Sequence, residues 1–563
     1  MMNALTERTG YCIALALGLG LATGFAIVFG YLSPDSWYYI LIAQGLREGH
    51  GCALYGHYLS AYPCGYPALL ALTAPTSDLP VMMVSSKITN LLLMGLSLTC
   101  VAAALRHRLA AAFVVLNPIT LHLFMYTWSE NLLLLCVCAT FLALTRLAED
   151  PRAFVGSAEP TNSSKFLFGR AIFPKSAKTI SWPFIGLRSN SRKWMALLVG
   201  SLIVGCFARY FFGPFAFILF LVAGAVYGRR LAIRVLPAFA VAGLVYLTYQ
   251  HVNTDLTGYP TGMPRLPAPE SPTLLVRMFL GAVAELGWTL VIPLLLAIGL
   301  SWRQIRFERT APPDAPARAA LFLLLAGAGF LLLGFVLRAS TYYDSYDKRT
   351  LGFGVVFVVA GLIARFVHLR RPQAWPVLAV LGLALFSPLY ADEDSIPQGL
   401  AQLRDGHYRF APATLSAFQR QGPPADTVVS FALPATPADL WNVDHIRQFY
   451  YGGTTRLISP DLAPDAVPET AGAFVNRVRQ AASGRCFVDF AAFPDRESFD
   501  LYLNVTIPTD QPLFGGPLKA SPRMDPALKA YLSGIFQPGA FLPCAEVLAL
   551  PQSRAIPVAV PHN

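Results

Sequence analysis

Charged residues are scarce in this chain of 563 residues. Only 13% of the residues are charged and 55% are hydrophobic, whereas soluble domains carry roughly a quarter of charged residues. A chain this apolar could not hide its surface in water, so the composition excludes an ordinary soluble protein. It predicts an integral membrane protein.

Several motifs are missing as well. The sequence has no Gly-Lys-Ser phosphate loop, no Rossmann fingerprint, no zinc pattern of Cys and His, and no Gly-x-Ser-x-Gly elbow. His57 and His122 are isolated, and an isolated histidine is usually structural. The sequence therefore gives no sign of nucleotide use.

The formal net charge is +11, but it is unevenly distributed. From Asp392 onward the chain has 17 acidic and 13 basic residues, so the excess of Lys and Arg lies in the first 391 residues. Cytoplasmic loops of membrane proteins collect such an excess. Nucleic-acid binding is the rival interpretation of a basic chain. We expect membrane lipids as partners of this chain and no nucleic acid.

Long apolar runs predict about eleven transmembrane helices. The first runs from Tyr11 to about Leu32, which is too long for a signal-peptide core and lacks a cleavage pattern. The others are centred near Leu93, Val115, Leu135, Leu202, Leu219, Ala242, Leu294, Leu325, Val358 and Leu381. Several are interrupted by Pro or Gly, which is tolerated where helices pack on one another.

Lys and Arg fix the orientation of these helices. The basic loops all fall on one side if the N-terminus is cytoplasmic; they contain Arg106 and Arg108, Lys165 to Lys193, Arg229 to Arg234, Arg303 to Arg309, and Arg365 to Arg371. The opposite side then receives a first outer loop at residues 33–80, the turn at Glu130, the loop from Asn253 to Pro272 and the turn from Asp344 to Arg349.

The segment 392–563 differs from the transmembrane domain at 1–391. Its apolar runs are short, near Val428, Arg456, Cys486 and Leu501, and Pro, Asp and Gly separate them. This pattern predicts strands and short helices of a C-terminal extracytoplasmic α/β domain.

Four of the nine cysteines lie outside the apolar runs. Cys52 and Cys64 share the first loop, and Cys486 and Cys544 share the C-terminal segment. Two such pairs predict an oxidising compartment and two disulfides, with unpaired thiols as the alternative.

The first outer loop begins with Asp35, directly after the first apolar run. A carboxylate here reaches both water and lipid headgroups, although Asp before an amphipathic segment is also a common helix cap. The pattern Asp-Ser-x-x-Tyr, which includes Asp35 and Tyr39, is followed by Gly49, Gly51 and the Tyr-Pro-x-Gly-Tyr-Pro turn with Tyr66.

This pattern resembles the first loop of GT-C superfamily glycosyltransferases, in particular bacterial members related to protein O-mannosyltransferases and the lipid A aminoarabinose transferase. The resemblance covers about Asp35 to Ala360 and is most specific from Asp35 to Leu72. It implies the GT-C fold, and it implies that Asp35 is the catalytic base. The chain departs from the family at Cys64, where relatives usually have Pro, and at Ser36, which leaves no paired carboxylate.

Further residues fit the same resemblance. Ser129 and Glu130 begin the fourth apolar run as a Ser-Glu pair does in relatives, and Arg209 lies in a family-like turn. Glu130 could instead only cap its helix. Lys87 lies within the second apolar run, where it either snorkels to the interface or meets a phosphate.

The turn before the tenth apolar run carries Asp347, Lys348 and Arg349, where relatives have a basic pattern close to the donor's phosphate. Its alternative role is an interfacial anchor with neighbouring tyrosines. The loop from Asn253 to Pro267, whose lone cation is Arg265, resembles an outer loop that covers the donor in relatives.

The sequence thus predicts a glycosyltransferase in the bacterial cytoplasmic (inner) membrane, with its site and C-terminal domain periplasmic. It would transfer a sugar from a polyprenyl-phosphate donor to a lipid, glycan or protein acceptor, with inversion. Arg349, Lys348, Arg209 and Lys87 are the predicted phosphate ligands, and Glu130, Tyr39, Tyr66, Asp347 and Arg265 line the acceptor cavity.

No cofactor is required by this prediction, and a divalent metal ion held by Asp35 and Glu130 is left open. The alternatives are a transporter or flippase, and a polymerase or ligase of lipid-linked glycans. Transporters often have two related halves, and the sequence has no such duplication. Polymerases and ligases depend on large outer loops with Arg and His, whereas here the first loop is the elaborate one. A non-catalytic scaffold would leave the predicted site residues scattered.

Overall fold

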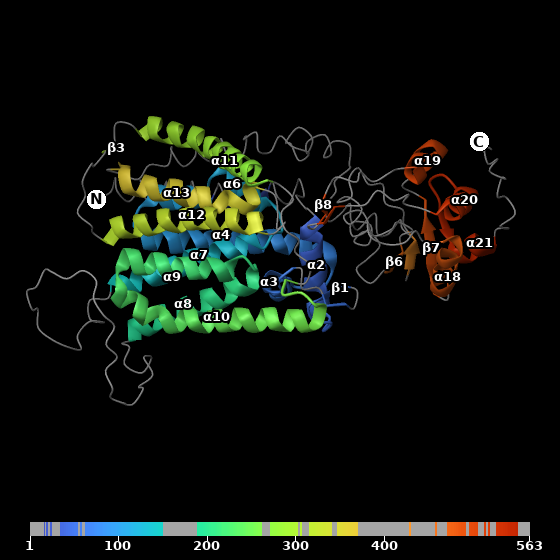
Figure 1. Ribbon diagram of the computed structural model, residues 1–563, viewed down its shortest axis with the longest axis horizontal. Coiled ribbons are helices and arrows are strands. Elements are labelled where there is room, and N and C mark those ends of the chain that lie inside the picture. The colour runs from blue at the N-terminus through green and yellow to red at the C-terminus, as the bar shows by residue number, and fades with distance from the viewer. Residues whose placement is uncertain are drawn as a thin grey trace, which may run out of the picture.

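The computed structural model describes ten helical segments of the membrane region and a small C-terminal sheet (Figure 1). The described residues are 16, 19, 20, 23, 24, 34–54, 57–58, 62–149, 189–261, 271–301, 305–306, 315–340, 346–369, 427–429, 456–458, 470–482, 484–490, 495–504, 512–513, 516–517 and 525–549. The predicted spans at Tyr11–Leu32 and near Leu381, and the boundary at residue 392, lie outside the residues that can be described.

Two short helices form the first outer loop. Helix α2 (Pro34–Arg47) begins with Asp35 in its first turn, and α3 (Gly65–Thr73) follows the strands β1 (Ala53–Leu54) and β2 (His57–Tyr58). Arg47 ends α2 and donates to the carbonyl oxygens of Ala71 and Pro75 at 2.7 and 3.0 Å, which ties the two helices together at their ends. The loop that carries Asp35 is thus a folded unit.

The membrane region is a bundle of apolar helices. Among the described residues, seven helices are long and apolar enough to cross a membrane, or eight if one bent pair counts as a single span. The described helices are α4 (Leu79–Leu105), α5 (Arg108–Val115), α6 (Pro118–Met125), α7 (Glu130–Glu149), α8 (Ser189–Ala208), α9 (Phe212–Tyr227), α10 (Arg229–Thr257), α11 (Pro272–Ser301), α12 (Ala315–Ser340) and α13 (Lys348–Phe366). The protein is therefore a multi-pass membrane protein.

Two of the predicted spans depart from regular transmembrane helices. The run near Val115 forms α5 and α6, which meet at 41° where Pro118 begins the second helix. Asn117 caps α6 by accepting from the amide of Thr120 at 3.0 Å, and it donates to the carbonyl of Phe113 at 2.8 Å. The run near Leu219 forms α9, whose 16 residues make it shorter than the other spans.

Small residues allow α12 and α13 to pack closely. A Cβ added at Gly327 would lie 2.7 Å from the carbonyl oxygen of Gly354, and one added at Gly361 would lie 2.8 Å from the amide nitrogen of Leu324. Helices in membranes associate by this kind of backbone approach. Close packing here fixes the position of α13, which begins next to the residues of the predicted site.

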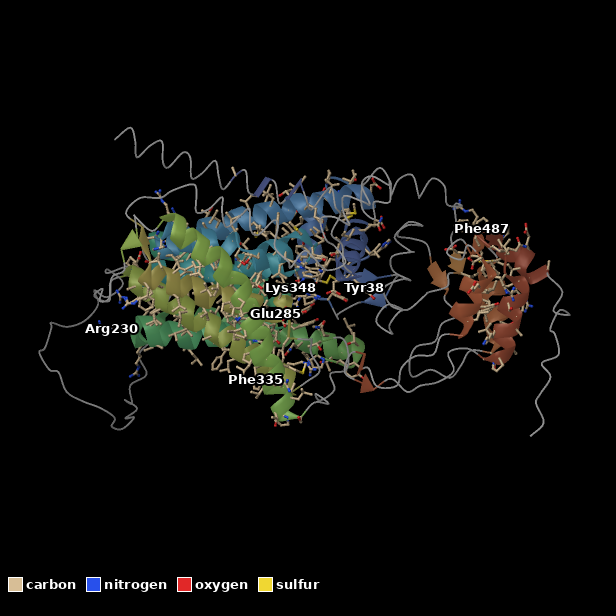
Figure 2. All side chains as sticks on the ribbon, turned by 90° about the horizontal axis from the view of Figure 1, so that it is seen from above. Tyr38, Arg230, Glu285, Phe335, Lys348 and Phe487 are labelled. Atoms are coloured by element: carbon tan, nitrogen blue, oxygen red, sulfur yellow. A yellow bond between two sulfur atoms is a disulfide. The ribbon has the colours of Figure 1, made fainter. Side chains whose placement is uncertain are left out.

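At the end of the bundle predicted to be the inner, cytoplasmic one, a carboxylate lies between two arginines. Glu149, at the end of α7, accepts from Arg106 at 2.7 Å and from Arg146 at 3.0 Å. The strands β3 (Ile305–Arg306) and β4 (His368–Leu369) pair near the ends of α11 and α13. Figure 2 shows Arg230 at one end of the bundle and Lys348 and Tyr38 towards the other.

The C-terminal residues form a four-stranded sheet with the order β10-β7-β5-β6. The strands β5 (Thr427–Val429), β6 (Arg456–Ile458) and β7 (Cys486–Asp489) are parallel, and β10 (Phe541–Pro543) is antiparallel to β7. The helices are α18 (Ala471–Ala481), α19 (Arg496–Asn504), α20 (Pro526–Ile535) and α21 (Cys544–Ala549), and β8 (Pro512–Leu513) pairs with β9 (Gly516–Pro517). This confirms the α/β character predicted for the segment.

Both predicted cysteine pairs are bonded. Cys52 is joined to Cys64 between the ends of α2 and α3, and Cys486 is joined to Cys544 between β7 and α21. The first disulfide closes the loop that lies between Asp35 and the bundle. The second holds the first turn of α21 against the sheet.

Candidate functional site

Four of the predicted site residues meet at one end of the bundle, the one predicted to be the outer end, although they come from four separate elements. Asp35 lies in the first turn of α2, Glu130 begins α7, Arg209 follows α8, and Arg349 lies in the first turn of α13. Each position is the end of a helix, which brings its side chain to the same end of the bundle. These residues form a cluster, whereas a non-catalytic scaffold was expected to leave them scattered.

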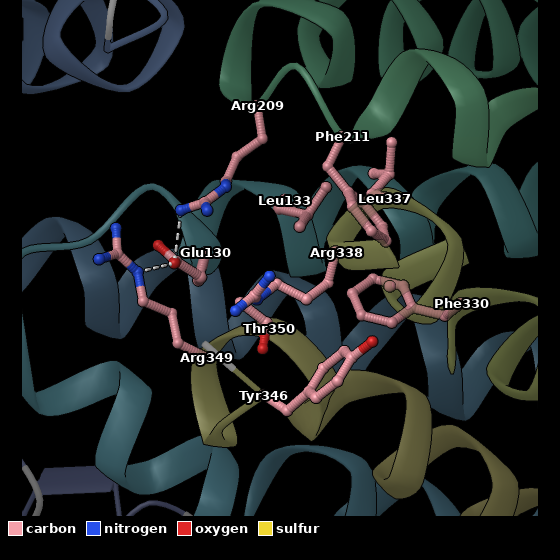
Figure 3. Close-up of a pocket in the computed structure, with 11 residues that line it drawn as sticks. Glu130, Leu133, Arg209, Phe211, Phe330, Leu337, Arg338, Tyr346, Arg349 and Thr350 are labelled. Atoms are coloured by element: carbon pink, nitrogen blue, oxygen red, sulfur yellow. Dashed lines mark hydrogen bonds and ion pairs between the residues drawn. The ribbon is translucent and has the colours of Figure 1, made fainter. Parts of the chain in front are cut away.

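Glu130 is the centre of this cluster. Its side chain is 1% exposed, and Arg209 donates to its Oε1 at 2.5 Å (Figure 3). The Nε of Arg349 donates to the same oxygen. A buried carboxylate is tolerated only when it is paired in this way, so Glu130 holds two guanidinium groups side by side.

Asp35 is joined to this cluster through Arg349. Its Oδ2 pairs with the NH1 group of Arg349, and its Oδ1 accepts a hydrogen bond from the hydroxyl of Tyr62 at 2.7 Å. The Asp35 side chain is 19% exposed, so it is more accessible than Glu130. Asp35 therefore contacts both Tyr62 of the first loop and Arg349 of the Glu130 cluster.

A pocket opens beside these residues. About 430 Å³ of space not filled by atoms, part of it open to solvent, is lined by Glu130, Leu133, Arg209, Phe211, Phe330, Gly334, Leu337, Arg338, Tyr346, Arg349 and Thr350. Figure 3 shows the side chains of its three arginines extending into one region from α12, from α13 and from the turn after α8. Because the lining has three guanidinium groups and one carboxylate, it carries an excess of two positive charges.

Arg338 is a pocket residue that the sequence analysis missed. It lies in the last turn of α12 and is only 4% exposed. Burying a cation near the end of an apolar run costs free energy unless the cation is paired or binds a ligand, and such a residue in the sequence is a signal of function.

The position of Arg349 is fixed by its neighbours. Asp347 caps α13, and its Oδ1 accepts from the backbone amides of Arg349 and Thr350 at 2.8 and 2.9 Å. The guanidinium group also lies over the ring of Trp128, 4.7 Å from its centroid. Cap and aromatic face together restrict the rotamers of Arg349. Asp347 was predicted to line the acceptor cavity, and the contacts seen here are those of a cap.

Three tyrosines pack beneath Asp35. Tyr39 shares a hydrogen bond with Ser129 at 2.8 Å and lies edge-on to Tyr66 and to Tyr62, with centroids 5.3 and 5.4 Å apart. Tyr66 is fully buried and donates to Asn90 at 2.7 Å. Tyr62, also missed by the sequence analysis, lies between the two loop cysteines. Burial, and after it the charge of Asp35, raises the pKa of Tyr62 well above its ordinary value.

Two further predicted phosphate ligands, Lys87 and Lys348, are not among the residues that line the pocket. Lys87 is 2% exposed and donates from Nζ to the carbonyl oxygen of Met125 at 2.7 Å. Lys348 is the first residue of α13, next to Arg349. Arg265 falls outside the described residues. The phosphate roles predicted for Lys87 and Lys348 stay predictions.

The two carboxylates are a poor fit to a divalent metal ion. Asp35 and Glu130 both face Arg349, and Glu130 also faces Arg209. Within the part of the chain that the structure describes, no group of three His, Cys, Asp or Glu side chains could hold a metal. The carboxylate oxygens of Asp35 and Glu130 are directed at guanidinium groups, and the reaction proposed for this site has no metal step.

Comparison with solved structures identifies the class of fold. The structure of ArnT from Cupriavidus metallidurans bound to undecaprenyl phosphate matches with a TM-score of 0.50 and 11% identity, over 91% of this chain and 97% of that chain. The chain therefore has the GT-C fold of polytopic membrane proteins, as the first loop predicted.

Two further structures match more weakly. The same ArnT in its apo state aligns with a TM-score of 0.37 and 10% identity, over 91% of this chain and 97% of that chain. An oligosaccharyltransferase from Archaeoglobus fulgidus, tethered to an acceptor peptide, aligns with a TM-score of 0.32 and 11% identity, over 88% of this chain and 68% of that chain. No family model and no curated protein matches the sequence.

Proposed function

We propose that this protein is a glycosyltransferase that transfers a sugar from a polyprenyl-phosphate donor to an acceptor hydroxyl at the outer face of a bacterial cytoplasmic membrane. The observation that carries the proposal is the pocket with three arginines beside Asp35. The GT-C fold supports it, because ArnT, a GT-C protein that matches this chain, was solved with undecaprenyl phosphate bound.

The charge of the pocket suits the leaving group of such a reaction. When a sugar leaves a lipid phosphate, the phosphodiester with one negative charge becomes a phosphate monoester that approaches two. An excess of two positive charges from Arg209, Arg338 and Arg349, net of Glu130, matches that dianion. Guanidinium groups that are already in place stabilise the charge as it develops.

The transfer itself is a single displacement. Asp35 takes the proton of the acceptor hydroxyl while the acceptor oxygen forms its bond to the anomeric carbon. The bond from that carbon to the phosphate oxygen breaks, and its electron pair leaves with the polyprenyl phosphate, which Arg349 and its neighbours receive. Attack from the side opposite the phosphate inverts the anomeric centre. The acceptor hydroxyl belongs to a lipid, a glycan or a protein.

The position of the site suits a donor embedded in the membrane. The pocket lies at the outer end of helices that span the bilayer, so a polyprenyl chain can stay among lipids while its phosphate enters the pocket. The apolar lining by Phe211, Phe330 and Leu337 is compatible with the first isoprene units. The C-terminal domain would lie on the same, periplasmic side.

The test uses the full chain in membrane vesicles with a panel of undecaprenyl-phosphate sugars. Release of undecaprenyl phosphate in the presence of acceptor is measured for the wild type, Asp35→Asn and Glu149→Gln. We expect Asp35→Asn to lower the rate by about 10²–10⁴, the range of general-base catalysis. Glu149→Gln removes a carboxylate from an arginine pair at the inner end and should leave the rate unchanged.

Two results would contradict the proposal. If Asp35→Asn retains the wild-type rate, Asp35 is not the base. If the wild type moves the intact donor across the vesicle membrane without releasing undecaprenyl phosphate, the chain is a transporter of lipid-linked sugars.

A further inference from the structure

Both carboxylate oxygens of Asp35 are engaged in the structure. Tyr62 donates to Oδ1 at 2.7 Å, and the NH1 group of Arg349 is paired with Oδ2. A general base needs one oxygen directed at the acceptor hydroxyl within hydrogen-bond reach. Each oxygen of the proposed base is therefore directed at a protein partner in the resting structure, and release of Oδ2 from Arg349 would leave that oxygen to accept from the acceptor hydroxyl.

The contact that Asp35 can give up is the one with Arg349. The guanidinium group of Arg349 contacts both Asp35 and Glu130, and it lines the pocket. A phosphate entering the pocket presents oxygens that compete with the Asp35 carboxylate for the same guanidinium group, because Arg binds both anions in the same planar geometry.

The two carboxylates on Arg349 differ in how readily they can be displaced. Glu130 is 1% exposed, begins a transmembrane helix and is also bound by Arg209. Asp35 is 19% exposed and lies on α2, which belongs to the outer loop. An incoming anion thus displaces Asp35, while Glu130 keeps Arg349 in place.

We propose that the Asp35–Arg349 ion pair is a substrate-released lock on the catalytic base. The donor's phosphate takes the place of Asp35 on Arg349, and the freed carboxylate turns to the acceptor hydroxyl. This inference rests on the proposed function and adds an order of events to it. A base that is freed only when the donor is bound becomes available together with the anomeric carbon that the acceptor attacks.

The lock has a measurable cost for phosphate binding. If Asp35 occupies Arg349 in about nine of ten resting molecules, the apparent dissociation constant is raised about tenfold over that of the unlocked site. Removing the carboxylate should therefore tighten phosphate binding about tenfold, or about 1.4 kcal/mol. A carboxylate that merely sits beside the donor without contacting Arg349 would give a smaller gain, from the loss of its repulsion of the phosphate alone.

The experiment measures binding rather than turnover. The full chain in nanodiscs is titrated with undecaprenyl phosphate and, in parallel, with undecaprenol, which lacks the phosphate. The variants are Asp35→Asn, Asp35→Ala and Arg349→Ala, and Glu149→Gln is the matched control. Glu149 also pairs with two arginines, but at the opposite end of the bundle. Thermal unfolding of each variant verifies that it is folded.

We expect Asp35→Asn and Asp35→Ala to bind undecaprenyl phosphate about tenfold more tightly than the wild type, and Glu149→Gln to bind it as the wild type does. Arg349→Ala should weaken binding, and undecaprenol should bind alike to all. If both Asp35 variants bind the phosphate lipid no more tightly than the wild type while the wild type still prefers it to undecaprenol, the lock is wrong and the phosphate site stands. If the wild type binds both lipids equally, the proposed function fails.

Discussion

Glu130 offers a test of how the site is held together. Replacing it by Gln keeps the shape of the side chain and removes the negative charge that Arg209 and Arg349 share. Those two guanidinium groups are 13% and 17% exposed, so they would face each other with little water between them. Breaking a buried pair by removing one partner typically costs about 3–5 kcal/mol.

The chain contains its own control for this change. Glu149 also pairs with two arginines, but it is 20% exposed, and its partner Arg106 is 48% exposed. Ion pairs of that kind contribute about 0–1 kcal/mol because water and salt screen them. Glu130→Gln and Glu149→Gln therefore remove the same group from the same kind of partners and differ mainly in burial.

The assay is thermal unfolding of the detergent-solubilised full chain. We expect Glu130→Gln to lower the melting temperature by about 5 °C or more and Glu149→Gln by less than about 1 °C. Undecaprenyl phosphate should raise the melting temperature of Glu130→Gln more than that of the wild type, because its phosphate supplies the missing anion. Equal losses in the two variants would refute the claim that the outer cluster is a buried ionic site.

Three further predictions concern residues around the pocket. Arg338→Met should weaken binding of undecaprenyl phosphate about tenfold in the nanodisc titration, and unchanged binding would remove it from the phosphate site. Replacing Cys52 and Cys64 together by Ser should lower the rate of undecaprenyl phosphate release, because the disulfide closes the loop that holds Tyr62 beside Asp35. Closing a loop of this length destabilises the unfolded chain by about 3 kcal/mol. A wild-type rate in the double variant would contradict this role. Lys87→Met should lower the melting temperature and change the affinity for undecaprenyl phosphate little, because the ammonium group lies on the Met125 carbonyl. A large loss of affinity with little change in melting temperature would make Lys87 a phosphate ligand.

Of the four charged residues that pair with Glu130 or Arg349 or share their pocket, the sequence identified three, because each lies where an apolar run ends. Asp35, Arg209 and Arg349 interrupt or follow such runs, and charge at those points is conspicuous in an apolar chain. Arg338 was missed although it has the same kind of position. The sequence could not show which of these cations share a pocket, because that depends on how α8, α12 and α13 pack.

The pairing of Asp35 with Arg349 could not be predicted either. The two residues are far apart in the sequence, and the resemblance assigned them to separate tasks, one to the base and one to the donor's phosphate. Only the packed structure brings the carboxylate onto the guanidinium group. The number of spans predicted from hydropathy has a similar limit, because hydropathy does not reveal that the run near Val115 bends at Pro118.

The two ends of the bundle use one motif for different purposes, and burial is what separates them. Each end has a carboxylate between two arginines, Glu130 at the outer end and Glu149 at the inner end. At the inner end water already solvates the charges, so a ligand anion would gain little by joining them. At the outer end the arginines outnumber the carboxylate in the pocket, and Glu130 is only 1% exposed. Water screens these charges less than those of the Glu149 cluster, which is why we place the donor's phosphate at that end and why the competing carboxylate of Asp35 matters.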